Sequence, residues 1–150
     1  MLCEFLIDVL KYALPSITTI ALFYLTSKKD NFSYKKALEK ERLEKCYFPF
    51  YRLYFTGLLS EIPFSKLTTE NREKFIDLLT DNLYFLDITS QTLFSALYSA
   101  HINLVVAQKN NSDLMIYEQT MDTAFWELKQ SIFSEYIRLL RKLGLPVPKN

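Results

Sequence analysis

The stretch "YALPSITTIALFYLTSKKD", from Tyr12 to Asp30, decides how the amino end of this chain is interpreted. Sixteen residues without a charge run from Tyr12 to Ser27, and two lysines follow them. As a helix this run is about 24 Å long, whereas the hydrocarbon core of a bilayer is roughly 30 Å thick. Extending the helix back to Leu2 adds mostly apolar residues and three charged ones, Glu4, Asp8 and Lys11. We therefore predict a slightly polar transmembrane helix.

The charges that flank this segment predict its orientation. Only Lys11 and the amino terminus precede it, whereas seven cations follow it: Lys28, Lys29, Lys35, Lys36, Lys40, Arg42 and Lys45. Positively charged residues concentrate on the cytoplasmic side of membrane proteins. We therefore predict a single-pass anchor of the cell inner membrane over residues 1–30, with its amino terminus outside and lipid as a partner. The alternative is an amino-terminal helix that packs inside a soluble core or lies at the membrane interface.

Polar residues inside the predicted anchor share one face. At 100° per residue, that face holds Asp8, Tyr12, Ser16, Thr19 and Thr26. Polar groups on one side of a membrane helix bind a neighbouring copy or line a hydrated path. Hydroxyl groups that bond to carbonyls of their own helix are the alternative. The first interpretation predicts a homo-oligomer that acts at the membrane, and the second predicts only an anchor.

Residues 31–150 have the pattern of an all-α domain. The chain contains only two glycines, and apolar residues recur at helical spacing in four segments. We therefore predict a cytoplasmic bundle of about four helices. Pro49 predicts a kink or break near Phe48, Thr68 or Thr69 is expected to cap a helix, and Gly144 is expected to end the last one. The aromatic cluster "YFPFYRLYF" has helical spacing, which favours a bundle core over a platform that stacks bases.

Residue types that carry catalysis or bind cofactors are sparse. The two glycines do not form a phosphate-binding loop, and Cys3 and Cys46 lack the spacing of metal ligands. The only histidine, His101, lies in an apolar stripe, as a hydrogen-bonded core histidine does. The net charge of +1 provides no field that attracts long nucleic acids. We predict a protein that is not an enzyme and that has no cofactor or metal.

Two basic groups are candidate contacts for anions or lipid headgroups. The first follows the predicted anchor and the second ends the last helix; their members are Lys28, Lys29, Lys35, Lys36, Arg138, Arg141 and Lys142. A topology signal and the stabilisation of a helix carboxyl end are the simpler explanations of these two groups. A site for a small anion, formed between subunits, is the alternative.

These expectations combine into a membrane-anchored sensor or effector. Its cytoplasmic bundle would self-associate, bind a protein partner or a small anionic ligand such as a nucleotide, and act through the membrane helix. In layout alone, the chain is similar to the small membrane effectors of prokaryotic antiviral defence. A passive membrane-tethered scaffold that docks another protein, and a soluble helical interaction protein, are the alternatives.

Overall fold

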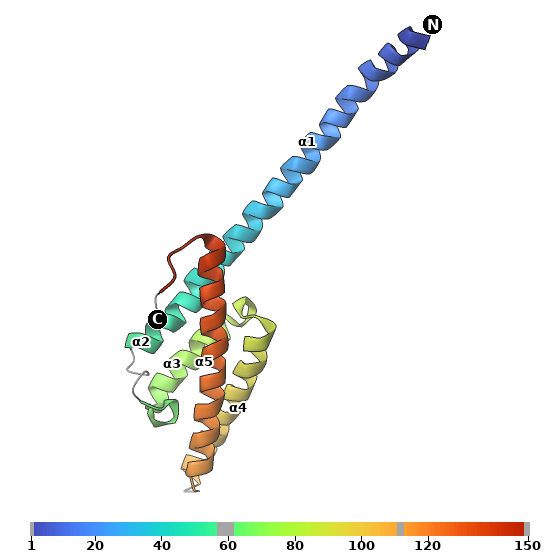
Figure 1. Ribbon diagram of the computed structural model, residues 1–150. Helices are drawn as coiled ribbons and strands as arrows, with labels where there is room; N and C mark the ends of the chain where they lie inside the picture. Colours follow the sequence, from blue (N-terminus) through green and yellow to red (C-terminus); the bar gives the residue numbers. More distant parts are fainter. Residues whose placement is uncertain (1, 57–61, 111–112, 149–150) are drawn as a thin grey trace. The chain divides into compact units, whose positions relative to one another are not determined.

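The computed structural model describes residues 2–56, 62–110 and 113–148, with side chains from residue 22 onward. Every regular element in these ranges is helical (Figure 1). The elements are α1 (Leu2–Arg42), the π-helix η1 (Leu43–Tyr47), α2 (Phe48–Thr56), the 3₁₀-helix η2 (Phe64–Lys66), α3 (Thr69–Asp81), the 3₁₀-helix η3 (Leu83–Phe85), α4 (Ile88–Lys109) and α5 (Met115–Leu143). The prediction of an all-α chain is confirmed.

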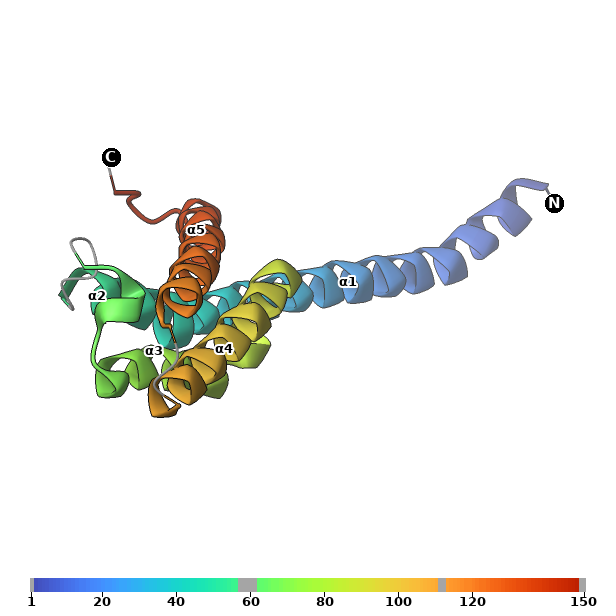
Figure 2. The same ribbon diagram turned by 90° about the horizontal axis from the view of Figure 1, so that it is seen from below.

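The chain divides into two units, Met1–Leu38 and Glu39–Asn150, and each is described here by itself. The described residues of the first unit, 2–38, all belong to α1. The second, which we call the body, contains the last turn of α1 together with α2, α3, α4 and α5. Within the body, α4 and α5 run antiparallel and share the most extensive contact between helices (Figures 1 and 2). The predicted bundle of about four helices is therefore present.

Local sequence signals set several helix ends. The Thr68 hydroxyl accepts a hydrogen bond from the Asn71 amide at 3.3 Å and so caps α3. Asp87 caps α4 in the same way, since its carboxylate accepts from the Ser90 amide at 2.7 Å. Gly144 ends α5 with φ of 71°, a left-handed conformation that costs glycine little. The predicted cap at Thr68 and the predicted end at Gly144 are both confirmed.

Pro49 changes the helix without interrupting it. A proline nitrogen carries no hydrogen, so it cannot donate the backbone bond that a helix interior requires. The chain accommodates it with the π-helical turn η1, where the Phe48 amide donates to the Leu43 carbonyl five residues back. Pro49 then lies at the second position of α2, directly after this turn. The predicted boundary near Phe48 is present, as a change of helix type.

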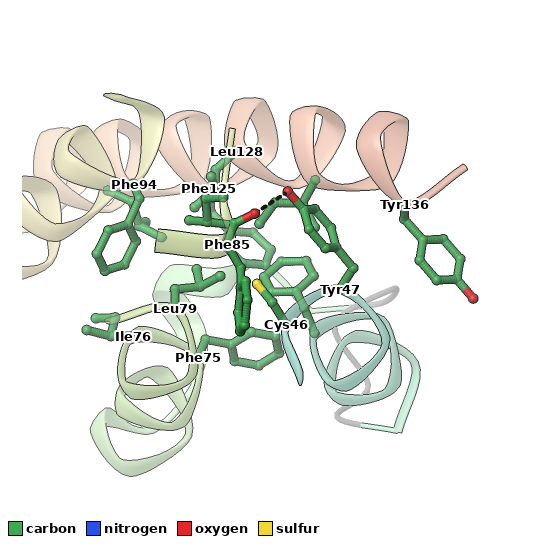
Figure 3. Close-up of a cluster of buried hydrophobic side chains, with 14 of the residues drawn as sticks. Cys46, Tyr47, Phe75, Ile76, Leu79, Phe85, Phe94, Phe125, Leu128 and Tyr136 are labelled. Atoms are coloured by element: carbon green, nitrogen blue, oxygen red, sulfur yellow. Dashed lines mark hydrogen bonds between the residues drawn. The ribbon is translucent and has the colours of Figure 1, made fainter. Parts of the chain in front are cut away.

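Aromatic side chains from all four helices of the body form its core. Phe50 is fully buried and contacts Phe75 edge to face, with ring centroids 5.6 Å apart. Phe64 stacks on Phe125 at 4.0 Å. Close by, the Tyr47 hydroxyl donates to the Phe85 carbonyl at 3.3 Å (Figure 3). The interpretation of "YFPFYRLYF" as bundle core is confirmed for its buried members, Tyr47 and Phe50.

The predicted transmembrane helix over residues 1–30 is not supported. Among the residues that the structure describes, no helix combines the length and the apolar character that crossing a membrane requires. The physical reason lies in the sequence of α1. Pro15, three threonines and two serines dilute the sixteen-residue uncharged run, and extending it in either direction adds charged side chains.

Candidate functional site

Four consecutive large apolar side chains are exposed on α1. Leu22, Phe23, Tyr24 and Leu25 are 64%, 75%, 62% and 62% accessible. Successive residues of a helix point about 100° apart, so these four surround the helix on all sides. The unit to which they belong contains no second element that covers them. We call these four residues the apolar collar.

Basic and aromatic residues follow the apolar collar. The Lys28 ammonium lies 5.4 Å from the centroid of the Tyr24 ring, a cation–π contact on the surface of the helix. Lys28, Lys29, Lys35 and Lys36 are all exposed, and so are Phe32 and Tyr34. Lysine mixed with aromatic rings after an apolar segment is typical of helices at the level of lipid headgroups.

Only one residue of the predicted polar stripe can be located in detail. The side chains of Asp8, Tyr12, Ser16 and Thr19 lie outside the described ones. The Thr26 hydroxyl donates to the Leu22 carbonyl of its own helix at 2.8 Å. At Thr26 this bond agrees with the simpler interpretation, in which the hydroxyl binds a carbonyl of its own helix. A role of the stripe in self-association stays a prediction.

The second basic group engages carboxylates of the body. Arg138 donates to Glu135 from Nε at 2.6 Å and from Nη2 at 2.7 Å, which holds its pKa above the usual range. Lys142 pairs with Glu39. Arg141 is exposed beside a hollow of about 440 Å³ whose lining includes four aromatic rings. Arg138 and Lys142 thus already have counter-charges, and anion binding by this group stays a prediction.

An ion pair joins the last turn of α1 to α5. Arg42 donates to Glu135 at 2.9 Å from Nη2 and to the Phe85 carbonyl at 2.8 Å from Nε. The same Nη2 lies 3.1 Å from the Tyr47 hydroxyl. The Glu135 side chain is only 7% exposed and the Arg42 side chain 17%, so water screens the pair weakly. Sequence reasoning missed this network, because its members are up to 93 residues apart.

A second feature that the sequence did not reveal surrounds Trp126. The side chain is 57% exposed and lies between two hollows, of about 570 and 270 Å³. Both hollows include Asp122, whose carboxylate accepts from the Ser65 amide at 2.7 Å and from its hydroxyl at 2.8 Å. The Trp126 ring therefore stands exposed beside fixed polar groups. In the sequence, the signal for an exposed Trp126 is that this residue lies outside the apolar stripe of α5.

The cysteine and the histidine of the body are both buried. Cys46 is fully buried, and burial raises the pKa of its thiol to about 12, so it is not a nucleophile at neutral pH. Within the described ranges, no group of three or more His, Cys, Asp and Glu side chains has an arrangement that holds a metal ion. His101 is 6% exposed, as expected of a core histidine. Its Nδ1 atom has no hydrogen-bond partner among the described residues, contrary to the expectation of a hydrogen-bonded ring.

His101 predicts a loss of stability in mild acid. Burial, and secondly the positive charge of Arg72, lower its pKa below the usual 6.5, so the folded state binds this proton less readily than the unfolded state. Stability is therefore full above pH 6.5 and falls as the pH decreases below it. We expect urea midpoints to decrease between pH 7.5 and 5.5, and the His101→Gln variant to lose most of this dependence. An unchanged slope in that variant would assign the effect to other groups.

Comparison of the chain with protein-family models, with curated proteins and with solved structures finds no match. The expected binding of a partner or ligand and the expected role in antiviral defence therefore stay predictions.

Proposed function

We propose that this chain is a membrane-attached, non-enzymatic helical protein, in which α1 inserts into lipid up to the apolar collar and holds the body at the membrane surface. The observation that carries the proposal is the exposure of Leu22, Phe23, Tyr24 and Leu25 on every side of the helix. Lys28 and Lys29 follow within one turn and reach the level of the headgroups.

The distribution of the apolar collar favours lipid over one protein partner. A single partner helix covers one side of α1, because the apolar stripe of a packed helix is typically a little over 100° wide. The four collar residues point in four directions that together span about 300°. Lipid chains cover all of these directions at once. Burying each Leu or Phe side chain contributes roughly 1.5–3 kcal/mol, so the collar adds substantially to the attachment.

The lysines support a cytoplasmic location of the body. Lys28, Lys29, Lys35 and Lys36 attract anionic lipids of the inner leaflet, each contributing about 1 kcal/mol near a charged surface. This attraction holds residues 39–150 on the side where such lipids are abundant. Attachment through α1 does not require the amino terminus to cross the bilayer, although the charge distribution predicts that it does.

Flotation of the full chain with lipid vesicles tests the attachment. The purified protein is mixed with vesicles of phosphatidylcholine and phosphatidylglycerol and centrifuged through a density gradient. We expect the wild type to float with the lipid. The triple variant Leu22→Ser, Phe23→Ser, Leu25→Ser is expected to bind at least tenfold more weakly, because three of the four collar side chains lose their apolar contact.

A matched variant tests whether flotation depends on the apolar collar or on any exposed apolar residues. Met115 and Ile116 are 72% and 70% exposed but lie in the body. The Met115→Ser, Ile116→Ser double variant is expected to float like the wild type. Equal flotation of the collar variant and the wild type, or a wild type that remains in the dense fraction, would contradict the proposal. Protease protection of a tag on the amino terminus then shows whether that end crosses the vesicle bilayer.

A further inference from the structure

The hollow of about 440 Å³ beside Arg141, which we call the Arg141 hollow, has walls from three segments of the body. Two of them are α2 and α5. Gly144 turns the chain at the end of α5, and the Leu145 amide donates to the Leu140 carbonyl at 2.9 Å. The chain then turns back (Figure 1), and Pro148 contributes to the third wall. A hollow of this size accommodates a small molecule.

Four aromatic side chains line the Arg141 hollow: Tyr51, Phe55, Phe133 and Tyr136. The Tyr51 ring lies 5.2 Å from the Phe133 ring and stacks on the Tyr136 ring at 4.8 Å, measured between centroids. These contacts hold the rings in place. Phe55 touches the same group and is still 52% exposed. A planar ligand ring therefore finds aromatic surface that is already positioned for stacking.

Arg141 is the only charged residue among the described residues that line the hollow. Its neighbours on α5, Arg138 and Lys142, pair with Glu135 and Glu39. Arg141 is exposed and forms no such pair with a carboxylate of the described residues. A guanidinium binds the oxygens of a carboxylate or a phosphate through two parallel hydrogen bonds. The charge of the hollow thus favours an anion and repels a cation.

The other polar groups of the lining are neutral donors. Burial, and secondly the neighbouring Tyr51, raise the pKa of Tyr136 above its usual value. Its hydroxyl, which points away from the core (Figure 3), therefore keeps its proton at neutral pH and does not repel an anion. Gln130 and Ser134 are exposed and supply an amide and a second kind of hydroxyl. The lining thus combines aromatic surface, one cation and hydrogen-bond donors.

We propose that the Arg141 hollow binds a small planar aromatic anion, that is, a ring that carries a carboxylate or a phosphate. The ring packs against the aromatic side chains, and the anionic group pairs with Arg141. A neutral ring would leave the guanidinium without a counter-charge, and a small anion without a ring would leave the aromatic lining in contact with water. The inference goes beyond attachment to a membrane and does not depend on it, because all of these residues belong to the body.

Calorimetric titration of the full chain in mild detergent tests the proposal with naphthoate and with naphthyl phosphate. Both are expected to bind, because they share the ring, and the tighter of the two shows whether the site prefers a carboxylate or a phosphate. Naphthol, which is neutral at pH 7, and inorganic phosphate are expected to bind about tenfold more weakly or less, since each lacks one of the two groups. Failure of both naphthyl anions to bind, or equal affinity for naphthol or inorganic phosphate, would overturn the proposal.

Three variants assign the binding to the hollow. Arg141→Gln removes the cation and is expected to weaken the binding of naphthoate about tenfold. Arg52→Gln makes the same change at an exposed position of α2 outside the hollow, and it is expected to bind like the wild type. Phe55→Leu keeps an apolar side chain but removes a ring, and it is expected to weaken binding about fivefold.

Uptake of naphthoate by the detergent is the same for every variant, so differences between variants report the hollow itself. Circular dichroism checks that the helix content of each variant matches that of the wild type. Unchanged affinity in Arg141→Gln, or an equal loss in Arg52→Gln, would show that the hollow does not hold the anion.

Discussion

Replacing Glu135 by alanine is expected to lower the free energy of unfolding by roughly 3 kcal/mol, because Arg42 would keep its charge in a largely buried position without a counter-charge. Two arginines converge on the Glu135 carboxylate, at 2.9 Å from Arg42 and at 2.6 Å from Arg138. Arg138 is 54% exposed and can turn towards water. Arg42 is 17% exposed and also bonded to the Phe85 carbonyl, which holds it in place. Urea unfolding followed by the fluorescence of Trp126, the only tryptophan, measures the change.

Two further variants show whether the cost comes from the unpaired charge. Arg138→Ala is expected to cost less than about 1 kcal/mol, because its pair with Glu135 is half exposed. The double variant Arg42→Leu, Glu135→Leu removes both charges and is expected to be more stable than Glu135→Ala. A Glu135→Ala variant as stable as the wild type would show that this network contributes little to the body. Equal losses for Glu135→Ala and Arg138→Ala would assign the effect to local helix contacts instead.

The elements that could be predicted from the sequence depend on local chemistry. Thr68 lies three residues before the amide that it caps, and Gly144 adopts a conformation that other residues rarely accept. The apolar stripe of α5 repeats at helical spacing, so most of its buried face could be predicted from the sequence. The stripe predicted for α4 is only partly buried, since Tyr98 is 48% exposed. Pro49 predicted a boundary near Phe48, but it did not predict the π-helical turn that forms this boundary. Proline rules out one backbone bond but does not specify which alternative geometry replaces it.

The features that could not be predicted depend on residues far apart in the chain. Arg42 and Glu135 come together only when the end of α1 packs against α5, and no spacing rule connects two positions 93 residues apart. The Asp122 and Ser65 contact beside Trp126 likewise joins residues 57 positions apart. The transmembrane prediction is not supported for another reason. The lysines that flank the segment fit a membrane anchor, whereas the apolar character of the segment itself is insufficient for a span.

Replacing Phe50 by alanine is expected to cost about 3–5 kcal/mol, the usual range for a fully buried phenylalanine. Its ring is 0% exposed and lies 5.6, 6.4 and 6.2 Å from the rings of Phe75, Phe125 and Phe133, measured between centroids. These neighbouring rings belong to two helices, α3 and α5, so the body cannot close the cavity by moving one of them. Phe55→Ala, in the same helix but 52% exposed, is the matched control and is expected to cost much less. Urea unfolding of both variants measures the difference, and similar losses would mean that "YFPFYRLYF" is not the centre of the core.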